Sequence, residues 1–307
     1  MRIGLSWDVD RFESANTGWE EIVAEAQAAD RMGFQSFWIR EGREAATDCS
    51  APSIFLTYLS QKTKSAQLRI GARRVTRALP AHIAEEVAVL DTFARGRAGL
   101  AFAPASRQGV PPGHVHEMIE FVTAAWAADE IRYRGEFLRF PSHTPDTAPR
   151  GVSTPEAEGA YLPQWEWGPE TPDFLSITPK PYFARTPVNV EIDDDETLEW
   201  AARAGVSPMV GAELPTNEAA ERLARYRSLA DAAGRSRCEV EAVLERRIVL
   251  DGAGDERTLG GSPQDVLNAI RALRGRTAIS HFVWRRDRAT PMDLYRFASE
   301  VQLLLQA

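Results

Sequence analysis

The chain has 307 residues, of which 44% are hydrophobic and 26% charged, and its formal net charge is −8. These are the proportions of a globular protein that can bury a large core, and the acidic balance disfavours a nucleic-acid partner. No apolar run approaches the ~20 residues of a membrane-spanning helix. With two cysteines and no stretch that resembles a secretory signal, we expect a cytoplasmic protein without a disulfide framework.

Strand-like apolar runs alternate with helical periodicities through the first 130 residues. Strands are predicted at residues 2–7, 35–40, 68–75 and 98–105. A helical pattern follows each of them, at residues 17–34, 51–64, 80–96 and 116–130. In the first of these patterns Thr17 is a candidate cap, and apolar residues such as Ile22 and Ala26 recur at helical spacing.

The same alternation resumes in the last 120 residues. Strands are predicted at residues 187–192, 207–212, 239–250 and 278–284. Helices are predicted at residues 195–205, 216–234, 262–275, where Ser262 is the cap, and 290–306. Repeated strand–helix units require a parallel sheet, and eight of them close naturally into a (β/α)8 TIM barrel formed by residues 1–307 as one domain. A doubly wound open sheet is the alternative, but the first strand–helix turn is not glycine-rich.

Residues 132–186 break this rhythm between the fourth helix and the fifth strand. The segment contains no convincing helix, and its middle is rich in Pro, Gly, Trp and acidic residues. Loops of this length in compact domains are usually functional or disordered. We expect an insertion that forms a lid over the carboxyl ends of the strands, with a surface excursion or a subunit contact as the alternative.

Several stretches together resemble the bacterial-luciferase-like flavin monooxygenase superfamily. They are MRIGLSW at the N-terminus, AADRMGFQSFW, ALPAHIAEEVAVLDTFARGR and ITPKPY. The superfamily includes alkanesulfonate and long-chain alkane monooxygenases and reductases that use the deazaflavin F420. The resemblance spans nearly the whole chain and implies a (β/α)8 barrel, often dimeric, that uses reduced FMN and O2, or else F420. Fold alone does not establish the chemistry.

The resemblance implies a cofactor at the carboxyl ends of the strands, where this sequence departs from the family. After the second strand, Glu41 matches an acid of the family, but Gly42 and Arg43 replace its histidines. His114, at the start of the fourth helix, is a further candidate acid–base group. We therefore expect Glu41 and His114 to be the polar groups nearest the reacting atoms.

Two arginines follow the third strand, at the position where family members often have a cis peptide bond against the flavin ring. That bond would lie near Ala72–Arg73. Strand alternation turns either Arg73 or Arg74 into the barrel, where a buried guanidinium needs an anionic partner such as Glu41, Glu191, a substrate or the flavin. Together with Arg40 and Arg43 of the preceding loop, these arginines predict a basic mouth that binds an anionic ligand.

The phosphate-binding turn of the family is poorly matched. After the fourth strand its glycines are missing, which leaves Ser106 and Arg107 as candidate phosphate ligands. After the fifth strand comes the acidic run DDDE, residues 193–196. Acids suit a helix N-terminus but repel a phosphate, so we expect the run to cap its own helix. A cation site there is the alternative, although the sequence predicts no metal centre.

Two functions follow from these features. The first is a monooxygenase that receives reduced FMN from a separate flavin reductase and oxygenates a small organic substrate with O2. The second is a flavin-free subunit that partners an active homologous barrel, which the missing histidines and glycines favour. An F420-dependent oxidoreductase is a further alternative. A homodimer, or a heterodimer with a homologous barrel, is expected.

Overall fold

A computed structural model of the chain describes residues 1–7, 15–41, 49–75, 79–140, 174–183, 186–235, 240–286 and 290–306. Eight parallel strands close into a barrel in the order β9-β11-β1-β2-β3-β4-β7-β8, because β8 pairs again with β9. The strands are β1 (Arg2–Trp7), β2 (Ser36–Ile39), β3 (Gln67–Arg73), β4 (Ala98–Phe102), β7 (Val188–Glu191), β8 (Ser207–Val210), β9 (Val243–Leu250) and β11 (His281–Arg286). The predicted (β/α)8 barrel is confirmed.

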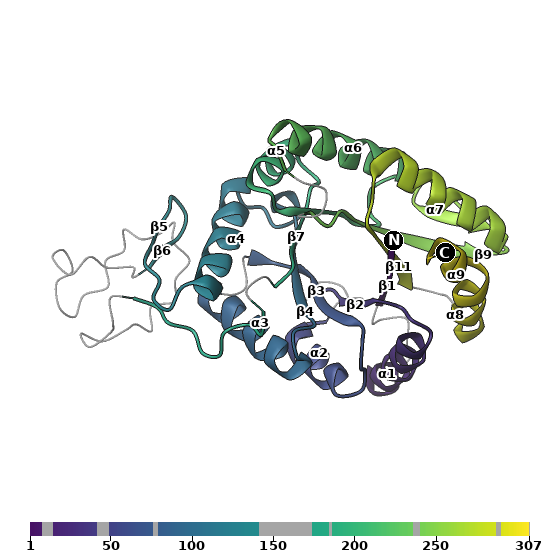
Figure 1. Cartoon of the computed structure of the whole chain (residues 1–307), viewed down its shortest axis with the longest axis horizontal. Helices are drawn as coiled ribbons and strands as arrows, with labels where there is room; N and C mark the ends of the chain where they lie inside the picture. The colour runs from purple at the N-terminus through teal and green to yellow at the C-terminus, as the bar shows by residue number, and fades with distance from the viewer. Residues whose placement is uncertain are drawn as a thin grey trace.

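Helices surround the barrel on its outside (Figure 1). They are α1 (Ala15–Arg31), α2 (Pro52–Ser60), α3 (Pro80–Ala94), α4 (Pro112–Ala127), α5 (Asp195–Ala204), α6 (Thr216–Ala232), α7 (Pro263–Thr277) and α8 (Pro291–Phe297), followed by the π-helical turn η5 (Ala298–Gln302) and α9 (Leu303–Gln306). Ser262 caps α7 as predicted, by accepting a hydrogen bond from the backbone N–H of Asp265. Thr17 lies inside α1, which begins two residues earlier than its predicted cap.

The apolar core has two separate parts, because alternate residues of each strand face opposite sides of the barrel wall. The larger part fills the space between the strands and the helices. The smaller part lies in the barrel lumen and consists of Trp38, Ala72, Ala101, Ala103, Met209, Val243 and Val283. We call it the lumen layer; polar and charged side chains occupy the lumen at both ends of the strands.

Three short strands were not predicted from the sequence. The first, β10 (Thr258–Gly261), extends the sheet by pairing in parallel with β9. The other two, β5 (Tyr133–Arg134) and β6 (Arg139–Phe140), form an antiparallel hairpin on the outer side of α4 (Figure 1). The Glu117 carboxylate on α4 holds this hairpin by accepting hydrogen bonds from the backbone N–H groups of residues 136–138.

The described parts of the 132–186 insertion therefore begin along α4. Leu175 returns to this region and pairs with Ile131, and the Lys180 ammonium donates to carbonyl oxygens at the end of α4. Residues 141–173, on which the predicted lid depends, lie outside the described residues. Among the described residues, no helix is long and apolar enough to cross a membrane.

Candidate functional site at the carboxyl end of the barrel

The amino end of the lumen contains a closed polar network. Glu241 pairs with Arg69 at 2.6 Å and with His281 Nδ1 at 2.9 Å, and His281 Nε2 lies 2.7 Å from Ser36 Oγ. Gly4 makes this contact possible, since a Cβ atom there would lie 2.0 Å from Ser36 Oγ. All these groups come from the beginnings of strands, so this network lies at the end of a barrel that usually serves stability.

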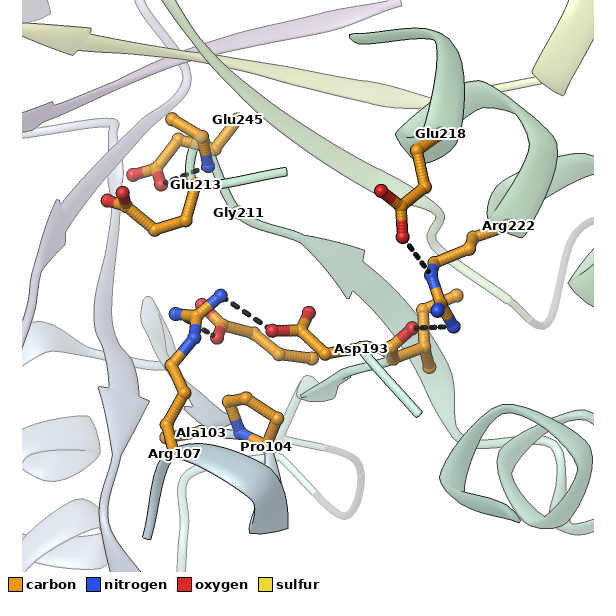
Figure 2. A network of polar contacts seen from close by, with 12 residues as sticks. Ala103, Pro104, Arg107, Asp193, Gly211, Glu213, Glu218, Arg222 and Glu245 are labelled. Carbon is orange, nitrogen blue, oxygen red and sulfur yellow. Dashed lines mark hydrogen bonds and ion pairs between the residues drawn. The ribbon is translucent and has the colours of Figure 1, made fainter. Parts of the chain in front are cut away.

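A second network of buried charges occupies the carboxyl end, which we call the mouth. Glu191, at the end of β7, lies between Arg40 at 3.3 Å and Arg107 at 2.9 Å. Arg107 comes from the short 3-10 helix η3 (Ala105–Arg107) after β4, and its second nitrogen contacts Asp193 at 2.7 Å (Figure 2). Arg40 also contacts Glu245 of β9 at 3.2 Å. The mouth thus joins the ends of β2, β4, β7 and β9.

The space for this network depends on small or polar neighbours. A Cβ atom at Gly211 would lie 3.2 Å from Glu191 Oε1 and 3.7 Å from Glu245 Oε2. Glu245 also accepts hydrogen bonds from Ser6 Oγ at 2.6 Å and from the backbone N–H of Ala212 at 3.2 Å. Glycine at position 211 therefore lets two carboxylates approach the same turn.

The mouth acids differ in how well their charge is stabilised. Burial alone would raise the pKa of Glu245, but Arg40 and Arg285 outweigh burial and lower this pKa to about 2. Burial and the neighbouring Glu191 charge instead raise the pKa of Asp193 to about 6, although Arg107 opposes them. Burial would lower the pKa of Arg107, yet the two carboxylates raise it. Asp193 thus gains a proton more readily than Glu245 does.

Glu41 and Arg73 lie together, as the sequence allowed. Both are buried, and the Arg73 Nε atom is 3.3 Å from the Glu41 carboxylate, while a second Arg73 nitrogen contacts Glu86 at 2.8 Å. The backbone N–H of Arg74 also donates to Glu41 at 3.0 Å. The cis peptide bond of this region joins Gly71 and Ala72, one residue before the expected position.

The other candidates lie elsewhere. Ser106 is exposed on η3. His114 is on α4, where its ring is stacked on Phe137 of the outer hairpin, with ring centroids 5.8 Å apart, and burial lowers its pKa. The structure does not bring His114 together with Glu41 or Arg107. Arg43 lies outside the described residues.

The acidic run after β7 divides into three roles. Asp193 contacts Arg107, whereas Asp194 caps α5 by accepting a hydrogen bond from the backbone N–H of Thr197 at 2.7 Å. Asp195 lies on the surface and contacts Arg225 at 2.8 Å. The predicted capping role is therefore confirmed for Asp194, while the inward direction of Asp193 was not foreseen.

Sequence reasoning missed several mouth residues. Glu245 of β9 and Arg285 of β11 come two residues after the lumen-layer residues Val243 and Val283, and Arg285 pairs with Glu213 after β8. A charged residue at a lumen-facing position near the end of a buried strand was the available signal. The expectation of a basic mouth is wrong for the described residues, because Arg40, Arg73, Arg107 and Arg285 each contact a carboxylate.

The flavin that the resemblance implies fits this end of the barrel only in part. Ala72 and Ala103, at the ends of the neighbouring strands β3 and β4, belong to the same buried layer as Trp38. Small apolar side chains beside an aromatic ring suit a flat ring system. The phosphate does not fit, because the guanidinium that would bind it is already paired with Glu191 and Asp193.

Comparisons with known proteins identify the family. A sequence profile of luciferase-like monooxygenases matches residues 1–258. The uncharacterized protein y4wF of Sinorhizobium fredii is 30% identical over 124 residues, which are 36% of this chain and 36% of that protein, so the chain spans about a third of its curated relative.

Solved structures share the fold over the full chain. Monooxygenase RslO1 from Streptomyces bottropensis covers 100% of both chains with a TM-score of 0.78 and 19% identity. The oxygenating constituent of 3,6-diketocamphane monooxygenase from Pseudomonas putida, in complex with FMN, covers 98% of this chain and 97% of its own with a TM-score of 0.70 and 15% identity. The F420-dependent tetrahydromethanopterin reductase from Methanopyrus kandleri covers 99% of both with a TM-score of 0.74 and 14% identity. The chain belongs to the luciferase-like monooxygenase family.

Proposed function

We propose that this chain is a cytoplasmic, flavin-dependent monooxygenase that oxygenates a small organic substrate with O2. The proposal rests mainly on the lumen layer. Its residues Ala72 and Ala103 lie at the ends of β3 and β4, next to the buried charges of the mouth. An apolar surface beside a few fixed polar groups is the usual composition of a cofactor site. Reduced flavin, supplied by a separate reductase, would provide the electrons that activate O2.

The chain itself would position the ligands and exclude water. Arg73 fixes the Glu41 carboxylate beside the Gly71–Ala72 bond, so that Glu41 presents a buried acceptor at the end of β3. Arg40 links Glu191 to Glu245 across the mouth and thereby holds the ends of three strands in place. A rigid, buried polar frame of this kind strengthens electrostatic interactions with a bound molecule.

Anaerobic stopped-flow absorbance tests the proposal. Reduced flavin mixed with the protein and then with O2 should reoxidise at a rate different from that of free reduced flavin. A parallel titration with reduced F420 separates the deazaflavin alternative. Reoxidation at the free rate at saturating protein, with no binding of either cofactor, would overturn the proposal.

A second candidate function is a flavin-free partner subunit of a catalytic homologue. The observation that favours it is the pairing of Arg107 with Glu191 and Asp193, which occupies the group expected to bind phosphate. Such a subunit would bind no flavin and would co-purify with a second, different barrel. Mass spectrometry of the purified assembly distinguishes it from a homodimer.

In either case we propose that the pairing surface is the outer face of α2 and α3. Ile54 and Tyr58 on α2, and Phe93 on α3, are exposed although they are large and apolar. The exposed Phe183 lies against the end of α3, since a Cβ atom at Gly96 would be 2.2 Å from its ring. Exposed apolar side chains on adjoining helices usually mark a protein interface. Light scattering should therefore show that Phe93→Glu dissociates a dimer.

A further inference from the structure

The turn after β7 contains carboxylate oxygens that are buried but lack an aligned hydrogen-bond donor. They are both oxygens of Glu191, Oδ1 of Asp193 and Oδ2 of Asp194, and this holds within the part of the chain that the structure describes. Arg40 and Arg107 approach Glu191 as ion pairs, but no hydrogen bond forms there. The Asp193 side chain is only 10% exposed, so these acceptors are withdrawn from bulk water. Buried acceptors of this kind need a donor.

The turn also lacks the groups that usually bind a phosphate. Acidic side chains already balance the partial positive charge at the N-terminus of α5. Asp194 accepts a hydrogen bond from the backbone N–H of Thr197, and Asp195 and Glu196 lie in the first turn. The neighbouring helix η3 follows Pro104, which has no N–H to offer. A phosphate at Arg107 would face like charges instead of free donors.

The charge of Arg222 acts on Asp193 by lowering its pKa, but Arg222 donates no hydrogen bond to this carboxylate. Its guanidinium contacts Glu218 at 3.3 Å (Figure 2). It also donates to the carbonyl oxygen of Ile192 at 3.4 Å. The donors at this turn are therefore engaged, whereas both Glu191 oxygens, which are ion-paired, and Asp193 Oδ1 accept no hydrogen bond. A ligand end that carries hydroxyl groups is complementary to such a turn, and one that carries a phosphate is not.

We propose that the mouth accepts a flavin whose side chain ends in neutral hydroxyl groups, reduced riboflavin in place of reduced FMN. Glu191 and Asp193 accept hydrogen bonds from the ribityl hydroxyls, and Arg107, which contacts both carboxylates, holds them in place. The inference rests on the proposed flavin-dependent function. It adds that the side chain of the flavin ends in a hydroxyl group and not in a phosphate.

Anaerobic fluorescence titrations of the purified chain at pH 7.5 test this preference, with reduced riboflavin, reduced FMN and reduced lumiflavin, which has no ribityl chain. Riboflavin should bind at least tenfold more tightly than either of the others. Asp193→Asn should tighten FMN binding at least tenfold and leave riboflavin within a fewfold. Asp195→Asn is the matched control, because it removes an exposed charge of the same acidic run.

Three results would overturn the inference. FMN binding as tight as riboflavin binding would show that the carboxylates do not reject a phosphate, and the flavin function would stand. Lumiflavin binding as tight as riboflavin would remove the role of the hydroxyls. Binding of none of the three would overturn the flavin function as well. Asp193→Ser repeats the comparison should Asp193→Asn fail to fold.

Discussion

The two ends of the barrel lumen both contain buried acids, but they stabilise them in opposite ways. At the amino end, Arg69 and His281 outweigh the burial of Glu241 and hold its pKa well below the usual range. At the mouth, burial and the Glu191 charge raise the pKa of Asp193 to about 6. Among the described residues, the Glu241 carboxylate has all its partners at the amino end, although Arg69 Nε has none, whereas the mouth keeps carboxylate oxygens that a ligand can satisfy.

The largest effect is expected when the amino-end network is broken. Glu241→Gln removes the counter-ion of Arg69, which is fully buried, and the carboxylate that contacts His281 Nδ1. An uncompensated buried charge destabilises a protein by about 3–5 kcal/mol, and urea unfolding should show a loss of this size. The exposed Glu256→Gln should change the free energy of unfolding by less than about 0.5 kcal/mol. A loss below about 1 kcal/mol for Glu241→Gln would contradict the comparison.

The pH dependence of Asp193 should give the next largest effect. Its raised pKa means that its contribution to stability is complete below the unfolded value of about 4 and is lost as the pH rises through about 6. Glu191, Arg107 and Arg222 face this carboxylate. From pH 4 to 7.5, Asp193→Asn should gain roughly 2–3 kcal/mol relative to the unmodified chain in urea titrations. A flat difference, or one of opposite slope, would refute the assignment.

Glu191→Gln makes at the mouth the same change that Glu241→Gln makes at the amino end. In this variant Arg40 still forms an ion pair with Glu245, and Arg107 still forms one with Asp193, so each guanidinium retains a carboxylate partner. We expect a smaller loss of about 1–2 kcal/mol in the free energy of unfolding. Equal losses for the two variants would show that the two ends do not differ as described.

The smallest effect concerns the helix cap after β7. Asp194→Ala removes the acceptor for the backbone N–H of Thr197 and should destabilise the chain by about 1 kcal/mol. Asp194→Ser should restore most of this, because serine is also a good cap. Thermal unfolding followed by circular dichroism measures both. No rescue by serine would mean that the charge of Asp194, and not its hydrogen bond to the backbone of Thr197, stabilises the chain.

Most of the fold was predictable because it depends on local patterns. Short apolar runs located the barrel strands, and helical periodicity with Ser262 as a cap located α7. The short strand β10 was missed because it has no pattern of its own and is strand only through its pairing with β9. The hairpin of β5 and β6 likewise depends on a contact with Glu117 on α4.

The candidate site was less predictable, because its residues meet only in the closed barrel. Arg107 was identified as an anion-binding group, but its partners Glu191 and Asp193 follow more than eighty positions later, and spacing could not assign them. The Arg73–Glu41 pair was foreseen as one of several options. His114 illustrates the opposite case, since the start of a helix does not reveal which side its side chain will face.

The lumen layer also separates the two networks of buried charges. Between the Glu241 cluster and the Glu191 cluster lie Trp38, Met209, Val243 and Val283, and the ion pairs of the described residues link Glu241 to Arg69 and Glu191 to Arg40 and Arg107. The effects of Glu241→Gln and Glu191→Gln should therefore add to within about 0.5 kcal/mol in the double variant. In a barrel divided in this way, substitutions at the mouth can change which ligand binds there. The amino-end network that stabilises the fold is not altered by them.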